Sequence, residues 1–316
     1  MTNMKPVFLF PGQGSQYVGM GKALYTQFDA AKKTFQEASD ALGYDMAKLC
    51  LEDPEERLNQ TEYTQPALLT TSIAIWRSLE ISADMGLAVA GHSLGEYSAL
   101  VAAGAMSFSD AVSVVSQRGR FMQEAVPEGC GSMAAVVGLS GEIVTAVCNE
   151  VASAGDEIFP ANFNAPDQVV IAGRQKSLEK AMALLSEKGA KRVIPLSVSV
   201  PSHTPLMKPA CARLKEVLYK IAGNDITVPL INNLEAKAIT KWSEARASLV
   251  DQLAFPLLWD QTIQTMKTMG ADFFIEIGPS RVLSGLMKRI DRTARVINAE
   301  DPEGIIKARE AIGGLC

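Results

Sequence analysis

The chain has 316 residues, of which 47% are hydrophobic, so it can build one sizeable core and a second, smaller one. Its formal net charge of -5 at pH 7 argues against a nucleic-acid-binding protein, because such a surface usually needs an excess of basic residues. No apolar run approaches the length of a membrane span and no cysteine pair has C-x-x-C spacing, so we expect a soluble, cytoplasmic α/β protein without a metal site.

The first predicted element is a short buried strand, residues 7–10, which runs into the glycine-rich loop PGQGSQYVGMGK. Strand, glycine loop and helix is the order in which many phosphate sites begin. The dinucleotide fingerprint fails here, because Tyr17 stands where its third glycine should be. The G-x-x-x-x-G-K-[ST] template also fails, because Gln16 and Ala23 occupy its first glycine and its hydroxyl position. The purpose of the loop must therefore come from the rest of the chain.

Helices and buried strands follow in turn. A helix is predicted over residues 22–42 from apolar residues at helical spacing, and a second over about residues 66–80, with Pro66 at its start. GLAVAGHSLG then reads as a strand without polar alternation, which indicates burial on both faces, as in a parallel sheet. A helix rich in small residues follows it. ADFFIEIGPS, near the C-terminus, is a second buried strand that runs into a loop.

The middle of the chain has a different pattern. Four strand candidates and two helix candidates alternate as βαββαβ, the split unit of ferredoxin-like folds. They are GSMAAVVGLS, GEIVTAVCNEVAS, EIFPANFN, DQVVIAGR, SLEKAMALLSEKG and KRVIPLSVS, in that order. We place this unit at residues 130–198, inserted in a larger α/β core made of residues 1–129 and 199–316.

The sequence GHSLG, residues 91–95, matches the G-x-S-x-G pattern of a nucleophile elbow. The predicted strand before it and the predicted helix after it supply the context that this pattern needs. In such a turn the serine hydroxyl is exposed on a strained backbone, and glycine on either side avoids clashes of Cβ. Another tight turn between a strand and a helix would fit the same residues, but the context favours Ser93 as a nucleophile.

A serine needs a base to become a good nucleophile, and the chain has two histidines. His92 precedes Ser93 at the end of a strand, where successive side chains point to opposite faces, so we expect it to pack behind the turn. His203 lies in the loop SVSVPSHTPLM. An ordinary surface-loop histidine would fit there, but elimination makes His203 the candidate base if Ser93 is a nucleophile.

Arg118 lies on the apolar stripe of a helix predicted around residues 110–126, whereas Arg120 lies on its polar stripe. A guanidinium group that points toward the protein needs an anion. One interpretation is a buried ion pair with an Asp or Glu from elsewhere in the chain. The other is a bidentate clamp for a substrate carboxylate, to which Gly119 would allow close approach.

Five motifs in order, FPGQGSQ, GHSLGEYSAL, QRGR, VPSH and EIGPS, resemble those of malonyl-CoA:acyl carrier protein transacylases of type II fatty-acid synthesis. The resemblance covers essentially the whole chain. It implies an α/β fold with a hydrolase-like core, a mainly parallel sheet and a nucleophile elbow, plus a small ferredoxin-like (βαββαβ) inserted subdomain. It also implies ping-pong transfer of malonyl from malonyl-CoA to the phosphopantetheine thiol of acyl carrier protein, through a malonyl ester on serine.

The resemblance assigns three residues to catalysis. Ser93 would attack the malonyl thioester, and His203 would take its proton and later act on the thiol of the carrier. The main-chain carbonyl of Gln252, in LVDQLAFPLLW, would orient the histidine in place of an acid.

Four further positions would bind the reacting group. The backbone N–H groups of Gln13 and Leu94 would form an oxyanion hole, where preorganised amides are worth about 3 to 4 kcal/mol. This role would explain the opening glycine loop. Arg118 would hold the malonyl carboxylate, and Asn162 would line the substrate cleft.

The implied substrates are malonyl-CoA and phosphopantetheinylated acyl carrier protein, with no permanently bound cofactor and no nucleic-acid or membrane partner. Carrier proteins of this kind are acidic, as this chain is, so docking would need a local basic patch. The lack of any heptad repeat favours a monomer. Two patches are candidates for docking: Lys188, Lys191 and Arg192, and, after EIGPS, Arg281, Lys288, Arg289 and Arg292.

Two other classes stay open. A serine thioesterase or another hydrolase could use the same Ser–His pair, with an acid such as Asp167 completing the chain order Ser…Asp…His. A non-catalytic module that binds acyl carrier protein could keep the fold. Arg118 separates the transacylase from the hydrolase, and the presence of Ser93, His203, Gln13 and Arg118 together argues against the module.

Overall fold

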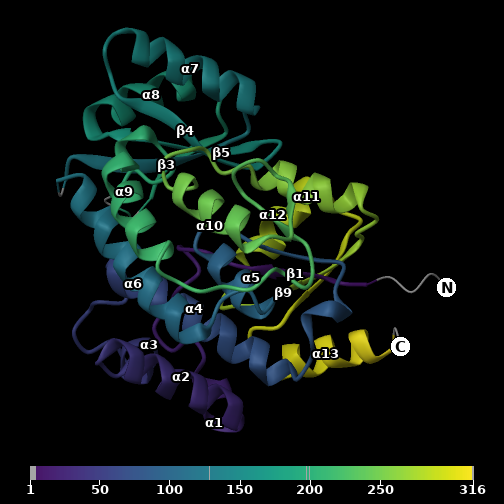
Figure 1. Cartoon of the computed structure of the whole chain (residues 1–316). Coiled ribbons are helices and arrows are strands. Elements are labelled where there is room, and N and C mark those ends of the chain that lie inside the picture. Colours follow the sequence, from purple (N-terminus) through teal and green to yellow (C-terminus); the bar gives the residue numbers. More distant parts are fainter. Residues whose placement is uncertain (1–4, 128, 197, 199, 315–316) are drawn as a thin grey trace.

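The computed structural model describes residues 5–127, 129–196, 198 and 200–314, which form two β-sheets with surrounding helices (Figure 1). The larger sheet has the strand order β10-β9-β1-β2-β7-β8. Its neighbouring strands are parallel except β7 and β8, which are antiparallel. The strands are β1 (Val7–Phe10), β2 (Ala88–Gly91), β7 (Leu230–Ile231), β8 (Ala238–Ile239), β9 (Phe273–Glu276) and β10 (Arg295–Asn298).

Helices cover both faces of this sheet, which explains why β1 and β2 show no polar alternation. Phe8 and Phe10 pack on one face with α4 (Thr61–Leu79), α5 (Gly95–Ala102) and α6 (Phe108–Ala125). Val7 and Leu9 pack on the other face with α11 (Trp259–Thr268) and α12 (Val282–Ile290). All four of these β1 side chains are fully buried.

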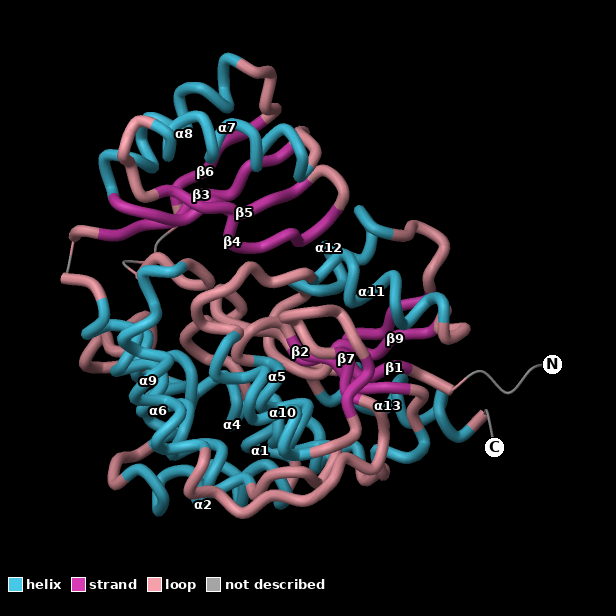
Figure 2. Tube along the Cα trace, turned by 45° about the horizontal axis from the view of Figure 1, so that its top comes forward, coloured by secondary structure: helices cyan, strands magenta, loops and turns pink. Residues whose placement is uncertain are grey.

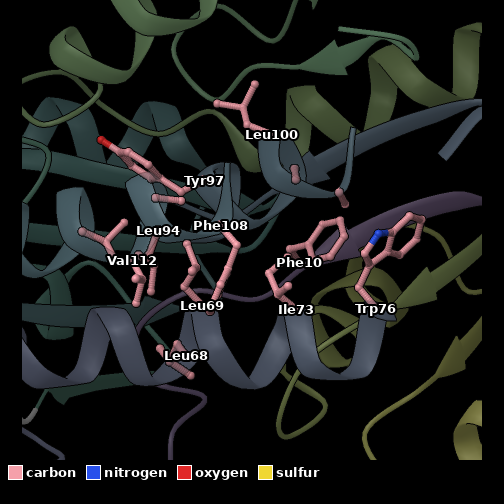
Figure 3. Close-up of a cluster of buried hydrophobic side chains, with 14 of the residues drawn as sticks. Phe10, Leu68, Leu69, Ile73, Trp76, Leu94, Tyr97, Leu100, Phe108 and Val112 are labelled. Carbon is pink, nitrogen blue, oxygen red and sulfur yellow. The ribbon is translucent and has the colours of Figure 1, made fainter. Parts of the chain in front are cut away.

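The first of these clusters is drawn in Figure 3. Leu69 and Ile73 extend from α4 toward the strand and helix that carry Phe10 and Leu94, and Trp76 lies beside Phe10. The ring of Trp76 lies edge-on to Phe8 at 5.0 Å between centroids. This packing fixes the end of β1 and the start of α5 relative to each other.

The remaining core helices correct two predictions. The helix expected over residues 22–42 is two helices, because Phe28 is extended between them (φ -118°, ψ 121°). The helix expected from Pro66 begins five residues earlier, at Thr61, because Thr64 and Gln65 are buried and hold its first turns despite the proline. These elements are α1 (Lys22–Gln27), α2 (Asp29–Leu42), α3 (Met46–Leu51), η1 (Ala83–Met85), η2 (Pro205–Met207), α9 (Lys208–Leu218), α10 (Trp242–Asp251) and α13 (Pro302–Gly313).

None of the helices in the described residues has the length and apolarity that a membrane crossing requires.

The smaller sheet is antiparallel, with the order β4-β5-β3-β6, and confirms the predicted βαββαβ unit. Two helices, α7 and α8, cover one of its faces (Figure 2). Residues 197 and 199 of the last predicted strand lie outside the described residues. The elements are β3 (Gly131–Val137), α7 (Gly141–Ser153), β4 (Ile158–Ala165), β5 (Gln168–Arg174), α8 (Gln175–Glu187) and β6 (Arg192–Pro195).

Strand β4 joins the smaller sheet to the core. The carbonyl of Ala161 accepts from the N–H of Leu257, and the carbonyl of Leu257 accepts from the N–H of Phe163, both at 2.8 Å. Leu257 belongs to the segment between α10 and α11. The smaller sheet therefore holds this segment by backbone hydrogen bonds, and the segment also contains Gln252.

The turn between β2 and α5 has no room for a side chain at its glycines. A Cβ on Gly95 would lie 2.0 Å from the carbonyl oxygen of Phe10. We expect Gly95→Ala to lower the free energy of unfolding by about 2 kcal/mol or more, because backbone atoms cannot move aside as a flexible side chain can. Urea denaturation measures the change.

Gly285→Ala is the matched control, since a Cβ on Gly285 in α12 meets nothing within 4 Å. Alanine inside a helix is favoured over glycine, so this control should be neutral or more stable by about 1 kcal/mol. Equal effects of the two substitutions would contradict the close packing of the turn.

Candidate active site

The site lies where loops leave the carboxyl ends of the parallel strands, the usual position of ligands in α/β sheets. Ser93 follows β2 and has a left-handed backbone (φ 52°), a strained conformation for a residue with a side chain. The loop after β1 passes close by, since a Cβ on Gly12 would lie 2.2 Å from the carbonyl oxygen of His92. The loop after β7 contributes Asn233, whose Oδ1 accepts from the N–H of Ser93 at 2.7 Å.

Ser93 and His203 form a hydrogen-bonded pair, with 2.9 Å between Oγ and Nε2. The other ring nitrogen, Nδ1, lies 2.7 Å from the main-chain oxygen of Gln252. A carbonyl oxygen can only accept, so Nδ1 carries the proton and Nε2 has a free lone pair facing the serine hydroxyl. The structure thus brings together Ser93, His203 and Gln252, as the sequence predicts.

The imidazole of His203 is buried in the protein, with 3% of the residue exposed. Burial lowers the pKa of His203 to about 3, although the hydrogen bond to Gln252 acts in the opposite direction. The ring is therefore neutral at physiological pH, the state in which Nε2 can accept a proton. Its loop is held in part by Thr204, whose hydroxyl donates to the carbonyl of Pro201 at 2.7 Å.

His92 faces away from the serine hydroxyl, as predicted. Its Nε2 lies 2.8 Å from Oδ1 of Asn164 on β4, and its ring lies edge-on to Trp259 at 5.3 Å. Burial lowers the pKa of His92 as well. Asn164 cannot be identified as its partner from the sequence, because the two residues are 72 positions apart and meet only in the folded chain.

Arg118 is buried beside the nucleophile, with 1% of the residue exposed. Its Nη2 donates to Ser93 Oγ at 3.2 Å and to Gln252 Oε1 at 3.0 Å, and its Nη1 donates to Gln65 Oε1 at 2.8 Å. No ion pair of Arg118 with a carboxylate occurs in the part of the chain that the structure describes. The hydrogen bonds of the guanidinium group thus go to neutral oxygens, and the group also lies over the ring of Tyr97, 5.6 Å from its centroid.

Gln252 contributes its side chain to the site as well as the predicted main-chain carbonyl. Its side-chain Nε2 donates to Oε2 of Glu96 at 2.8 Å and to the carbonyl of Ser93 at 3.2 Å. Glu96 on α5 is fully buried, and burial raises its pKa to about 7. The sequence reasoning missed Glu96 and Gln65; both look like ordinary helix residues until the fold brings α4, α5 and α6 together.

Gln13 and Leu94 lie in the two loops that meet at the elbow. Within the described residues, neither backbone N–H donates a hydrogen bond to another protein group. The side chain of Gln13 is occupied elsewhere, donating to Thr61 Oγ1 at 3.3 Å. Unpaired amides next to a nucleophile are available to an oxyanion.

The two remaining predicted site residues lie elsewhere. Asn162 is buried on β4, at a bulge that bridges to Leu257, and among the described residues its side chain makes no hydrogen bond to Ser93. Asp167 does not complete a triad: it pairs with Arg289 on the surface, with 3.0 Å between Oδ2 and Nη1, and Nδ1 of His203 is taken by Gln252. The order Ser…Asp…His built on Asp167 is therefore wrong. No cluster of three or more His, Cys, Asp or Glu suited to a metal occurs among the described side chains.

Comparison with known proteins agrees with this geometry. The model of the acyl transferase domain family matches residues 7–302. The malonyl CoA-acyl carrier protein transacylase of Bacillus subtilis (strain 168) is 48% identical over 301 residues, which are 95% of this chain and 95% of the relative. The enzyme of that name from Escherichia coli (strain K12) is 47% identical over 304 residues, 96% of this chain and 98% of the relative.

Solved structures give the same result. A malonyl-transacylase in complex with its type II PKS acyl-carrier protein superimposes with a TM-score of 0.94 at 46% identity, covering 97% of this chain and 99% of that one. The malonyl CoA-acyl carrier protein transacylase from Coxiella burnetii gives 0.94 at 41% identity, covering 98% and 99%. The chain therefore belongs to the acyl transferase domain family, among the malonyl CoA-acyl carrier protein transacylases.

Proposed function

We propose that this protein transfers the malonyl group from malonyl-CoA to the phosphopantetheine thiol of acyl carrier protein, through a malonyl ester on Ser93. The observation that carries the proposal is the position of Arg118, whose Nη2 lies 3.2 Å from Ser93 Oγ. A buried positive charge at that distance suits an acyl group that is attached to the serine and bears a free carboxylate of its own.

In the first half-reaction, Nε2 of His203 accepts the proton of Ser93 as Oγ attacks the thioester carbonyl of malonyl-CoA. The carbonyl π electrons move to oxygen, and the backbone N–H groups of Gln13 and Leu94 stabilise the resulting negative charge. Collapse of this intermediate breaks the C–S bond. The proton on His203 passes to the departing sulfur, so coenzyme A leaves as a thiol.

In the second half-reaction, the thiol of the carrier protein gives its proton to the free Nε2 and attacks the malonyl ester. Collapse returns the proton to Ser93 Oγ and leaves a malonyl thioester on the carrier. A neutral carbonyl from Gln252 is enough to orient His203, because a thiolate leaves easily and the imidazole needs less activation than for an amide. Asn162 remains a proposed contact of the acyl group.

The alternative is a hydrolase, in which water replaces the carrier thiol. In the described part of the chain, Nδ1 of His203 contacts a carbonyl and no acid, and a neutral ester would not use a buried arginine beside the nucleophile. The predicted division into a core, residues 1–129 and 199–316, and a subdomain, residues 130–198, forms part of the proposal, as does a monomeric state.

The acyl-enzyme can be observed directly. Intact-protein mass after brief mixing with malonyl-CoA should show a malonyl adduct on the wild type and none on Ser93→Ala. Arg118→Ala should load malonyl about a hundredfold more slowly, because the carboxylate loses its charged partner, and should keep loading from acetyl-CoA. Free malonate without an adduct would favour the hydrolase. The absence of both an adduct and turnover would contradict the transacylase and the hydrolase alike.

The low pKa of His203 predicts a pH-dependent stability. The pKa is about 3 in the folded protein and 6.5 in an ordinary histidine, so the unfolded chain binds the proton more tightly. The neutral, buried imidazole therefore makes its full contribution to the free energy of unfolding above pH 6.5. That contribution is lost as the pH falls toward 3, by up to about 1.4 kcal/mol per pH unit. The free energy of unfolding of the wild type should fall below pH 6.5 more steeply than that of His203→Gln. Parallel curves would show that the imidazole is not buried in its neutral form.

The docking patch of the carrier protein can be tested by charge reversal. We favour the patch on α12, where Lys288, Arg289 and Arg292 line a hollow of about 580 Å³ with Gly285, next to the contact with β4. Lys288→Glu with Arg292→Glu should raise KM for acyl carrier protein about tenfold, since rim charges steer acidic partners, and should leave Ser93 loading from malonyl-CoA unchanged.

The matched control is Lys188→Glu with Lys191→Glu at the second basic patch. Both lysines are exposed near β6. If the control raises KM and the α12 variant does not, the carrier docks at the second patch instead.

A further inference from the structure

Glu96 is a buried acid that the mechanism above leaves without a task. Its side chain is fully buried, and it forms no ion pair within the described residues. Its Oε2 accepts from Nε2 of Gln252 at 2.8 Å and from the N–H of Asn233 at 3.1 Å, whereas its Oε1 has no partner. Burying a carboxylate in this way is costly, so its presence needs a reason.

The reason lies in the amide of Gln252, which has one donating end and one accepting end. Oε2 of Glu96 also accepts from the N–H of Asn233, and the carbonyl of Ser93 can only accept, so the NH₂ end of Gln252 faces these two oxygens. The oxygen end then faces Arg118, where Oε1 accepts from Nη2 at 3.0 Å. A guanidinium group can only donate, so the opposite orientation would place donor against donor and acceptor against acceptor.

We propose that Glu96 is a positioning residue that acts through the side chain of Gln252: it holds Arg118 Nη2 toward Ser93 and so sets the preference for acyl groups with a free carboxylate over neutral acyl groups. This inference rests on the proposed function and deepens it. The main-chain carbonyl of Gln252 orients His203, so one residue serves the base through its backbone and the clamp through its side chain.

The indirect arrangement has a chemical advantage. If Glu96 contacted Arg118, the ion pair would compete with the carboxylate of the substrate. Because the amide of Gln252 lies between them, Arg118 is oriented without a direct contact to a carboxylate. Its hydrogen-bond partners are neutral: Gln65, Ser93 and Gln252. No carboxylate of the described residues is hydrogen-bonded to Arg118, so its N–H donors are available to the carboxylate of the ligand.

A second branch from Glu96 provides an internal control. Asn233 donates its N–H to Glu96, and its Oδ1 accepts from the N–H of Ser93 at 2.7 Å. Disturbing this branch would move the nucleophile itself and slow all acyl donors alike. Only the branch through Gln252 can change the ratio between malonyl and acetyl loading.

The test is the ratio of first-order rates of Ser93 loading from malonyl-CoA and acetyl-CoA, measured by quenched intact-protein mass. Glu96→Ala removes the acceptor and should lower this ratio roughly ten- to a hundredfold, the worth of a hydrogen bond to a charged group. Glu96→Gln is isosteric and keeps an acceptor oxygen for Gln252 and Asn233, so it should hold the ratio within about threefold of the wild type. A uniform loss in Glu96→Ala, or an equal fall of the ratio in both variants, would overturn the proposal.

If Glu96→Ala does not fold, Gln252→Met tests the same chain of contacts from Glu96 through Gln252 to Arg118. It keeps the main-chain carbonyl for His203 and removes the amide. The malonyl-to-acetyl ratio should fall as in Glu96→Ala, and Glu96→Gln added to Gln252→Met should change it no further, because contacts in one relay are not additive. If Gln252→Met keeps the wild-type malonyl-to-acetyl ratio, Glu96 does not act on Arg118 through Gln252 and the proposal is refuted. A wild type that forms no malonyl adduct would instead refute the proposed function.

Discussion

The site depends on a single glutamine that makes hydrogen bonds in four directions. Gln252 accepts from His203 with its main-chain oxygen and from Arg118 with its side-chain oxygen, and it donates to Glu96 and to the carbonyl of Ser93. Its segment is held by the backbone bonds between Leu257 and β4. The smaller sheet therefore helps to place the segment whose Gln252 contacts Ser93, His203 and Arg118.

Much of the fold follows from local patterns in the sequence. The apolar run of β1 predicts burial on both faces, and Phe8 and Val7 indeed pack on opposite helical layers. The βαββαβ order gives the smaller sheet without any knowledge of its contacts. The sequence does not predict the break between α1 and α2 or the start of α4. The backbone of Phe28 and the burial of Gln65 are decided by tertiary packing, which outweighs propensity and the usual position of proline.

The residues proposed to react could also be identified from the sequence, each for its own reason. Ser93 has a local motif, His203 follows from the scarcity of histidine, and Arg118 departs from the pattern of its helix. Glu96 and Asn233 could not be found in this way. They are 137 residues apart in the chain and acquire a role only when β7 lies next to β2. Residues whose partners are distant carry no periodic signal.

The burial of Arg118 has a thermodynamic consequence. Removing a guanidinium group from water is unfavourable, and its neutral partners compensate only in part. The guanidinium group is dehydrated once, when the chain folds, so an arriving carboxylate does not have to dehydrate it at each turnover. In the proposed function, part of the binding energy of a malonyl group would come from relieving this unfavourable burial. If Arg118 holds malonyl as proposed, the acyl-enzyme would then be more stable against unfolding than the free enzyme.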